Sequence, residues 1–283
     1  MGEVKFGYWV KAARPKTLPV SMAPVVMAVA FSALFTSVSW LPAAICLAFA
    51  VMAQVLSNLV NDYADGLKGS DNDRLGPQRM VASGLIPEKT MLRGIIVWSI
   101  LTFIVGCTLL LWGGWILLPF GLVIMLCAWA YSSGPYPLSR HALGDLAVVL
   151  FYGIAPVVLT FFIQTGLVNH KIIIAGLAVG LVADKLLIVN NYRDVDQDLS
   201  NGKKTTVGIF GKQVMGTAYC LITAMAVALG FIFMHGIISA WIWLISVVPY
   251  LIYALRVNSK FMSLKDKGTG INKLIGLSSL EAI

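Results

Sequence analysis

The sequence predicts an all-α fold, a bundle of transmembrane helices. Hydrophobic residues make up 58% of the 283 residues and charged residues only 12%, whereas soluble domains usually contain about 25% charged residues. Apolar stretches also recur along the chain, and each reaches the roughly 20 residues that a helix needs to cross a bilayer. We therefore expect a multi-pass membrane protein that forms a single domain over residues 1–283.

Eight full spans are predicted, followed by a ninth partial one. The full spans cover residues 17–37, 41–60, 91–112, 113–131, 144–166, 171–190, 214–234 and 237–256. The ninth begins near Ile271 and is too short to cross by Ile283. The basic N-terminal segment leads directly into a full-length span, so it is not predicted to be a cleaved signal.

Positive charge is unevenly distributed along the chain, whose formal net charge is +8. Of the 21 Lys and Arg residues, only Lys171 falls in an odd-numbered loop, and Lys185 falls within a span. Because cytoplasmic loops are enriched in Lys and Arg, we expect the N-terminus and the even-numbered loops to be cytoplasmic and the chain to lie in the inner (plasma) membrane. Topology and contact with anionic lipid thus explain the charge, and nucleic acid is not expected as a partner.

The end of the second predicted span has four amide and carboxylate side chains. Asn58, Asn61, Asp62 and Asp65 stand at positions i, i+3, i+4 and i+7, and these positions share one face of an α-helix. This pattern predicts that all four side chains point into the same site.

The end of the sixth span has a similar arrangement. Asn191, Asp194 and Asp198 stand at i, i+3 and i+7, and Asn190 precedes them, whereas Asp196 points away from this face and is expected to be solvated. The likeness of two segments separated by four spans suggests two related halves. Both segments belong to long polar loops on one side of the membrane, where function usually resides.

Clustered carboxylates require a compensating cation. Like charges on one helical face cost about 0.2–0.5 kcal/mol per pair in water, and more at a membrane boundary. Oxygen ligands suit Mg²⁺, which binds through carboxylates and substrate phosphates. We therefore predict Asp62, Asp65, Asp194 and Asp198 as metal ligands and catalytic residues, with Asn58 and Asn61 beside them and Asp71 as a further candidate ligand. The alternative is that these are solvated charges at helix ends.

A diphosphate that bridges two such ions needs further positive charge. Basic residues follow or surround both clusters, and we expect them to bind the substrate: Lys68, Arg74, Arg79, Arg193, Lys203 and Lys204. Asn190 and Asn191 are predicted to bind substrate with them.

The loop after the fourth span contains two prolines and a glycine, which predict a defined turn. Arg140 and Asp145 flank the start of the next span and are candidate substrate-binding residues, whereas His141 is either a catalytic base or an exposed loop residue. Asp184 and Lys185 lie deep in the sixth span. Intramembrane ionisable groups are functional candidates, so these two residues either face a cavity or form a buried structural pair.

These motifs resemble the two aspartate motifs of the UbiA superfamily of intramembrane prenyltransferases. The resemblance rests on Asn58-x-x-Asn61-Asp62-x-x-Asp65 and Asp194-x-x-x-Asp198 and extends from Arg14 to about Lys212. Residues 14–19, 69–71, 134–138, 143–145 and 190–194 are similar to the branch that prenylates 1,4-dihydroxy-2-naphthoate in menaquinone synthesis. Gly69 is a departure, because many members have a third acid at this position.

The resemblance implies a central cavity open to the cytoplasmic side, a polyprenyl diphosphate donor held through Mg²⁺, and an aromatic quinone precursor as acceptor. In the naphthoate branch the new bond replaces the carboxylate, with loss of CO₂, and Arg140 or Lys185 is the expected partner of that carboxylate. The turn at residues 134–138 favours the naphthoate over 4-hydroxybenzoate, the acceptor in ubiquinone synthesis. A membrane transporter is disfavoured, because a transport path needs polar groups across the whole bilayer.

Overall fold

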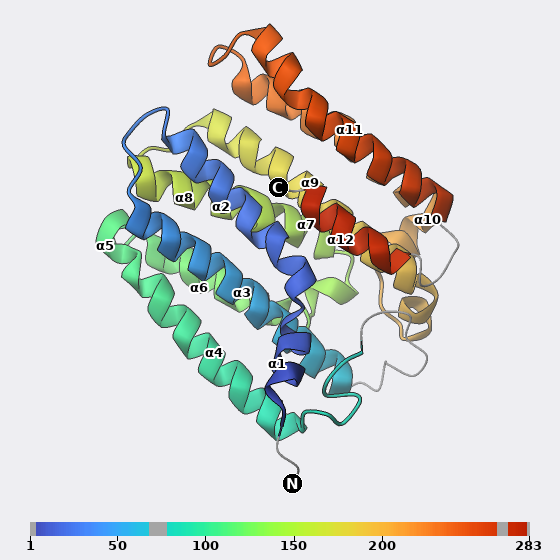
Figure 1. Cartoon of the computed structure of the whole chain (residues 1–283). Helices are drawn as coiled ribbons and strands as arrows, with labels where there is room; N and C mark the ends of the chain where they lie inside the picture. The colour runs from blue at the N-terminus through green and yellow to red at the C-terminus, as the bar shows by residue number, and fades with distance from the viewer. Residues whose placement is uncertain (1–3, 68–77, 265–270, 282–283) are drawn as a thin grey trace.

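A computed structural model describes residues 4–67, 78–264 and 271–281, and within these ranges the chain is helical with no β-strand. Figure 1 shows the helices packed as a bundle of long rods. In chain order they are α1 (Phe6–Ala13), η1 (Pro15–Thr17), α2 (Leu18–Ser32), α3 (Trp40–Leu67), α4 (Glu88–Thr108), α5 (Leu110–Gly113), α6 (Leu117–Ala130), η2 (Leu138–Arg140), α7 (Gly144–Val149), η3 (Leu150–Ile154), α8 (Ala155–Thr165), α9 (His170–Ser200), α10 (Thr206–Met234), α11 (Ala240–Leu264) and α12 (Ile271–Glu281). The predicted all-α class is confirmed.

Seven helical stretches in the described part are long and apolar enough to cross a membrane. The predicted fourth span, over residues 113–131, corresponds to the shorter helix α6 with 14 residues. Its start is set by Gly114, whose φ of 72° and ψ of −179° end α5 in a conformation that favours glycine. The other predicted spans agree with the helices to within a few residues, except where α3, α9, α10 and α11 extend beyond the apolar stretch.

Helix α9 is the centre of the bundle. It packs against α2, α7, α8, α10 and α12. In the most apolar 18-residue segment of α9, 61% is buried inside the protein, whereas the corresponding segments of α4 and α11 are only 17% buried. The backbone approaches α9 closely where α7 (Gly144–Val149) leads into the π-helical turn η3. A Cβ atom on Gly180 of α9 would lie 2.5 Å from the carbonyl oxygen of Val149, so only glycine allows this backbone contact.

The two Asn–Asp segments are helical extensions beyond the apolar stretches. Helix α3 continues to Leu67 and α9 to Ser200. Figure 1 shows these extensions at the end of the bundle where α1 lies. The fold thus brings both predicted clusters to one end of the molecule.

The partial ninth span is helix α12, with 11 residues. It packs along α9 and α11 and also contacts α2 and η1. Leu274, Ile271 and Ile275 belong to the same apolar core as side chains of α9 and α10. The described part of α12 is therefore an integral part of the bundle.

Candidate active site

A cavity of about 260 Å³ lies between α2, α3, α6, η3, α8 and α9. One part of its wall is polar and includes nine of the predicted site residues: Asn58, Asn61, Asp65, Arg79, Asn190, Asn191, Arg193, Asp194 and Lys203. Another part is apolar and includes Val25, Phe49, Leu109, Leu117 and Ile163. The cavity therefore joins a charged region to an apolar interior, as expected for a ligand with a polar head and a hydrocarbon tail.

In the first cluster, Asn61 is the central residue. Its side-chain nitrogen donates to Asp65 Oδ2 at 3.2 Å and to Ser132 Oγ at 2.8 Å. Its Oδ1 accepts from Arg14 at 3.0 Å and from Arg79 at 3.2 Å. Arg79 also forms a salt bridge to Asp65 with an N–O distance of 2.5 Å, so the Asp65 carboxylate is paired with a nearly buried guanidinium.

Asp62, which was predicted as a metal ligand, does not share this face in the structure. Its two carboxylate oxygens accept hydrogen bonds from the backbone amides of Met80 and Val81, each at 3.0 Å, and the residue is 1% exposed. It is also absent from the cavity wall. Each carboxylate oxygen thus accepts one main-chain hydrogen bond, and the side chain anchors the turn that follows Arg79.

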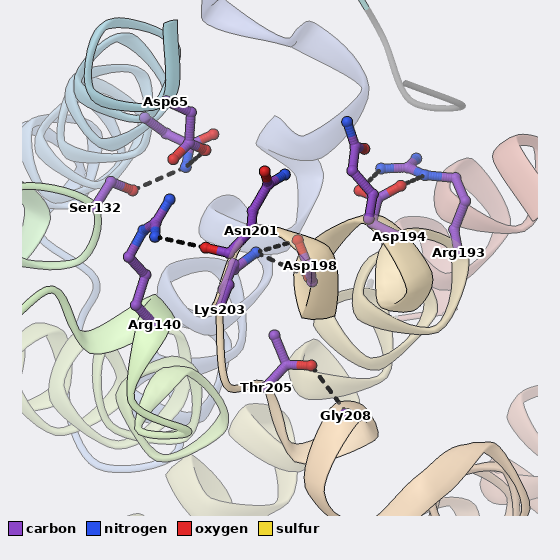
Figure 2. Close-up of polar contacts among 12 residues, drawn as sticks. Asp65, Ser132, Arg140, Arg193, Asp194, Asp198, Asn201, Lys203, Thr205 and Gly208 are labelled. Atoms are coloured by element: carbon purple, nitrogen blue, oxygen red, sulfur yellow. Dashed lines mark hydrogen bonds and ion pairs between the residues drawn. The ribbon is translucent and has the colours of Figure 1, made fainter. Parts of the chain in front are cut away.

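In the second cluster each carboxylate also has a basic partner. Arg193 forms a two-pronged contact with Asp194, with both N–O distances at 2.6 Å, and Lys203 lies 3.1 Å from Asp198. Figure 2 shows Asp65 beside Ser132 on one side and the Asp198–Lys203 and Arg193–Asp194 pairs on the other. Asp196 is outside this arrangement, since its side chain is 90% exposed, which confirms that it is solvated.

The loop after α6 contributes Tyr131 and Ser139 to the cavity wall. Arg140, Asp145 and Lys204 were also predicted to bind substrate, but they do not line the cavity. Arg140 donates to the carbonyl of Asn201 at 3.3 Å, and Asp145 accepts from Thr206 at 2.9 Å. The backbone amide of Lys204 donates to the carbonyl of Arg140 at 3.1 Å, and the backbone amide of Ala142 donates to the carbonyl of Lys204 at 2.8 Å. These residues tie the loop to the segment that follows the second cluster.

Comparison with known proteins identifies the family. The sequence model described as the UbiA prenyltransferase family matches residues 21–279, which is most of the chain. The chain belongs to this family. Of the residues in the motifs that carried the resemblance, Asn58, Asn61, Asp65 and Asp194 line the cavity, whereas Asp62 and Asp198 do not.

Relatives within the UbiA prenyltransferase family have one recurring activity. The chain is 34% identical over 245 residues to 1,4-dihydroxy-2-naphthoate octaprenyltransferase of Escherichia coli, covering 83% of this chain and 79% of the relative. It is 33% identical over 229 residues to the enzyme of the same name from Mycobacterium tuberculosis, covering 81% and 78%.

Solved UbiA structures share the fold. A UbiA homolog from Archaeoglobus fulgidus bound to GPP and Mg²⁺ matches with a TM-score of 0.70 and 18% identity, covering 97% of this chain and 96% of that one. The apo structure of a UbiA homolog from Aeropyrum pernix matches with a TM-score of 0.71 and 16% identity, covering 100% and 97%.

The side chains of the two clusters offer the type of ligand atom that a hard divalent ion prefers. Asp65, Asp194 and Asp198 offer carboxylate oxygens and Asn61 an amide oxygen, the ligands that Mg²⁺ prefers. Each carboxylate is engaged by Arg79, Arg193 or Lys203, respectively. Among the residues that the structure describes, no three His, Cys, Asp or Glu side chains form a group that could hold an ion. Lys68, Asp71 and Arg74 lie outside the described residues.

Lys185 and Asp184 are buried but do not line the cavity, so Lys185 is not placed to pair with an acceptor there. Lys185 is 0% exposed and pairs with Glu281 of α12, not with Asp184. Sequence reasoning missed Glu281 because its partner is far away along the chain. It also left Arg14, Gln54 and Tyr131 out of the site. Arg14 had a signal, since residues 14–19 belong to the segment that resembles the naphthoate branch.

Proposed function

We propose that this protein transfers a polyprenyl group from a polyprenyl diphosphate to 1,4-dihydroxy-2-naphthoate, with release of diphosphate and CO₂. The observation that supports this most is the cavity whose charged part contains Asp65 of the first motif and Asp194 of the second, and whose other part is apolar. The enzymes of that name from E. coli and M. tuberculosis, at 34% and 33% identity, support the choice of acceptor.

The charged end would hold the donor diphosphate. Asp65, Asp194 and Asp198 would hold Mg²⁺, and the ion, when bound, would neutralise the diphosphate and stabilise it as a leaving group. Arg79, Arg193 and Lys203 are already paired with these three carboxylates. A bound diphosphate offers the same basic side chains new anionic partners. We therefore infer that each salt bridge breaks when substrate binds, so that the carboxylate can coordinate the ion and the basic side chain can bind a phosphate.

The apolar end would hold the isoprenoid tail. Val25, Phe49 and Leu117 come from α2, α3 and α6, and Leu109 lies between α4 and α5, so several helices provide this part of the wall. A hydrocarbon chain placed there is removed from water, which favours binding by about 25 cal/mol per Å² of apolar surface buried. This arrangement directs the reactive first carbon of the tail towards the charged end.

The proposed reaction needs no base for a ring proton. The allylic C–O bond breaks and the electron pair leaves with the diphosphate, stabilised by Arg79, Arg193 and Lys203. The new C–C bond forms at the ring carbon that carries the carboxylate. The carboxylate then departs as CO₂ and leaves its bonding pair to restore the aromatic ring. The product is the quinol form of demethylmenaquinone, which a later oxidation converts to the quinone.

We also propose that the protein lies in the inner membrane with its N-terminus and charged cavity end on the cytoplasmic side. The distribution of Lys and Arg supports this orientation. The soluble acceptor would reach the site from the cytoplasm, whereas the donor tail would remain in the bilayer.

The test is a competition assay with the purified protein. Equal concentrations of 1,4-dihydroxy-2-naphthoate and 4-hydroxybenzoate are supplied with one labelled polyprenyl diphosphate and Mg²⁺, and products are separated by mass. We expect a single prenylated naphthoquinol and one CO₂ per transfer, measured from the carboxyl-labelled acceptor. Prenylation of 4-hydroxybenzoate alone would refute the proposal.

A further inference from the structure

Helix α12 is connected to α9 by polar contacts near both of its ends. Asn272 Oδ1 accepts a hydrogen bond from Arg193 Nη1 at 2.9 Å, and Glu281 pairs with Lys185. Asn272 and Glu281 are nine residues apart on α12, and Arg193 and Lys185 are eight apart on α9. At about 1.5 Å per residue both separations are about 12–14 Å, so the two helices run antiparallel in a matched register.

The contact between Asn272 and Arg193 reaches the second aspartate motif. Arg193 uses Nε and Nη2 for the two oxygens of Asp194 and Nη1 for Asn272. A guanidinium is planar and rigid, so fixing Nη1 on one side fixes the direction in which the other two donors point. The orientation of the Asp194 carboxylate therefore depends on a side chain from the other helix.

The contact between Lys185 and Glu281 is in the apolar interior. Lys185 also donates to Thr223 Oγ1 at 3.0 Å and to Asn258 Oδ1 at 2.9 Å, and the Lys185 and Glu281 side chains are both 0% exposed. A buried pair of this kind fixes position, because any shift leaves an uncompensated charge. It sets the register of α12 and thereby the position of Asn272.

We propose that Asn272 is a positioning residue of the diphosphate site, which holds the Arg193 guanidinium so that Asp194 faces the donor. Residue 272 lies far from both aspartate motifs in the sequence, and its hydrogen bond to Arg193 connects it to the site. The inference rests on the proposed function for the identity of the donor site, but not on the identity of the acceptor.

The test measures donor binding in the absence of acceptor. Geranyl diphosphate is titrated into the purified full chain in the presence of Mg²⁺, and the Kd is determined by calorimetry. We expect Asn272→Ala to raise the Kd about tenfold, because it removes a hydrogen bond to a charged group. Asn272→Asp keeps an acceptor oxygen towards Arg193 and should restore most of the affinity. Lys273→Ala is the matched control, since this neighbour on α12 is exposed.

The melting temperature of each variant, together with the KM values for donor and acceptor, distinguishes a loss of positioning from a general loss of structure. The proposal expects an unchanged melting temperature, a raised KM for the donor and an unchanged KM for the acceptor. Wild-type donor affinity in Asn272→Ala would overturn it. Equal losses of donor affinity in folded Asn272→Ala and Asn272→Asp would also overturn it. If Asn272→Ala does not fold, Asn272→Asp decides: retained donor affinity supports the proposal and lost donor affinity overturns it. Because no acceptor is present in the titration, the proposed acceptor can be wrong without changing this result.

Discussion

At the scale of single residues, the seven-residue spacing of the first motif was only partly informative. Helical periodicity placed Asn61 and Asp65 together in the cavity, but it also predicted Asp62 for the same face. Asp62 is instead held by the backbone amides of Met80 and Val81. These donors lie 18 and 19 residues further along the chain, so their approach depends on how the chain returns to α3. No local pattern contains that information.

Asp62 should therefore contribute to stability and not to metal binding. Asp62→Ala leaves two buried amide donors unpaired, which should lower the free energy of unfolding by about 3 kcal/mol. The melting temperature in detergent measures this, with Asp196→Ala as the control because that side chain is 90% exposed. A variant that melts like the wild type but has no activity would return Asp62 to the catalytic residues.

The three carboxylates that pair with basic residues at the site should behave differently. We expect Asp65→Ala, Asp194→Ala and Asp198→Ala each to reduce turnover by about 100-fold or more while the protein keeps its fold. Turnover by Asp196→Ala should be close to that of the wild type. Product formation at saturating donor and acceptor is the measurement, and a wild-type rate in any of the three would remove that residue from the site.

At the scale of helices, hydropathy located the spans well but not their irregularities. The break at Gly114 and the close approach of Gly180 to Val149 depend on backbone conformation and on a neighbouring helix. Composition does not encode either. The extensions of α3 and α9 were likewise visible in the sequence only as polar segments, and helical spacing within them supplied the correct secondary structure.

The contact between α9 and the end of α7 should tolerate no side chain at residue 180. In Gly180→Ala the new methyl group would meet the Val149 carbonyl oxygen at 2.5 Å, so the helices must separate. We expect a loss of about 1–3 kcal/mol from this overpacking. Gly276→Ala in α12 is the control, because nothing lies within 4 Å of its added Cβ and alanine favours a helix by up to about 1 kcal/mol. Equal melting temperatures for the two variants would contradict the close packing.

The buried pair between α9 and α12 can be tested by removing one partner and then both. Lys185→Met leaves Glu281 uncompensated and should cost about 3–5 kcal/mol. Combining Lys185→Met with Glu281→Leu should recover much of the lost stability, since replacing both charges by apolar groups is often neutral. Thermal unfolding of the two variants checks this. A double variant that is less stable than Lys185→Met would show that the pair itself is not the source of the effect.

At the scale of the whole molecule, metal removal should abolish activity without unfolding the protein. In excess EDTA the diphosphate loses the ion that would neutralise it, whereas the salt bridges of Asp65, Asp194 and Asp198 leave the carboxylates paired. We expect complete loss of turnover, recovery when Mg²⁺ is restored, and the same melting temperature throughout. Full turnover in EDTA would exclude the metal from the reaction.

The position of α12 also has a consequence for the time course of biosynthesis. Arg193 and Asn272 are 79 residues apart and Lys185 and Glu281 are 96 apart, so α9 is made long before its partner helix. During that interval Lys185 of the nascent chain lacks its partner Glu281, and Arg193, which holds Asp194, lacks its hydrogen bond to Asn272. Translation must proceed through residue 281 before both contacts can form, so both contacts between α9 and α12 form only after α10 and α11 have also been made.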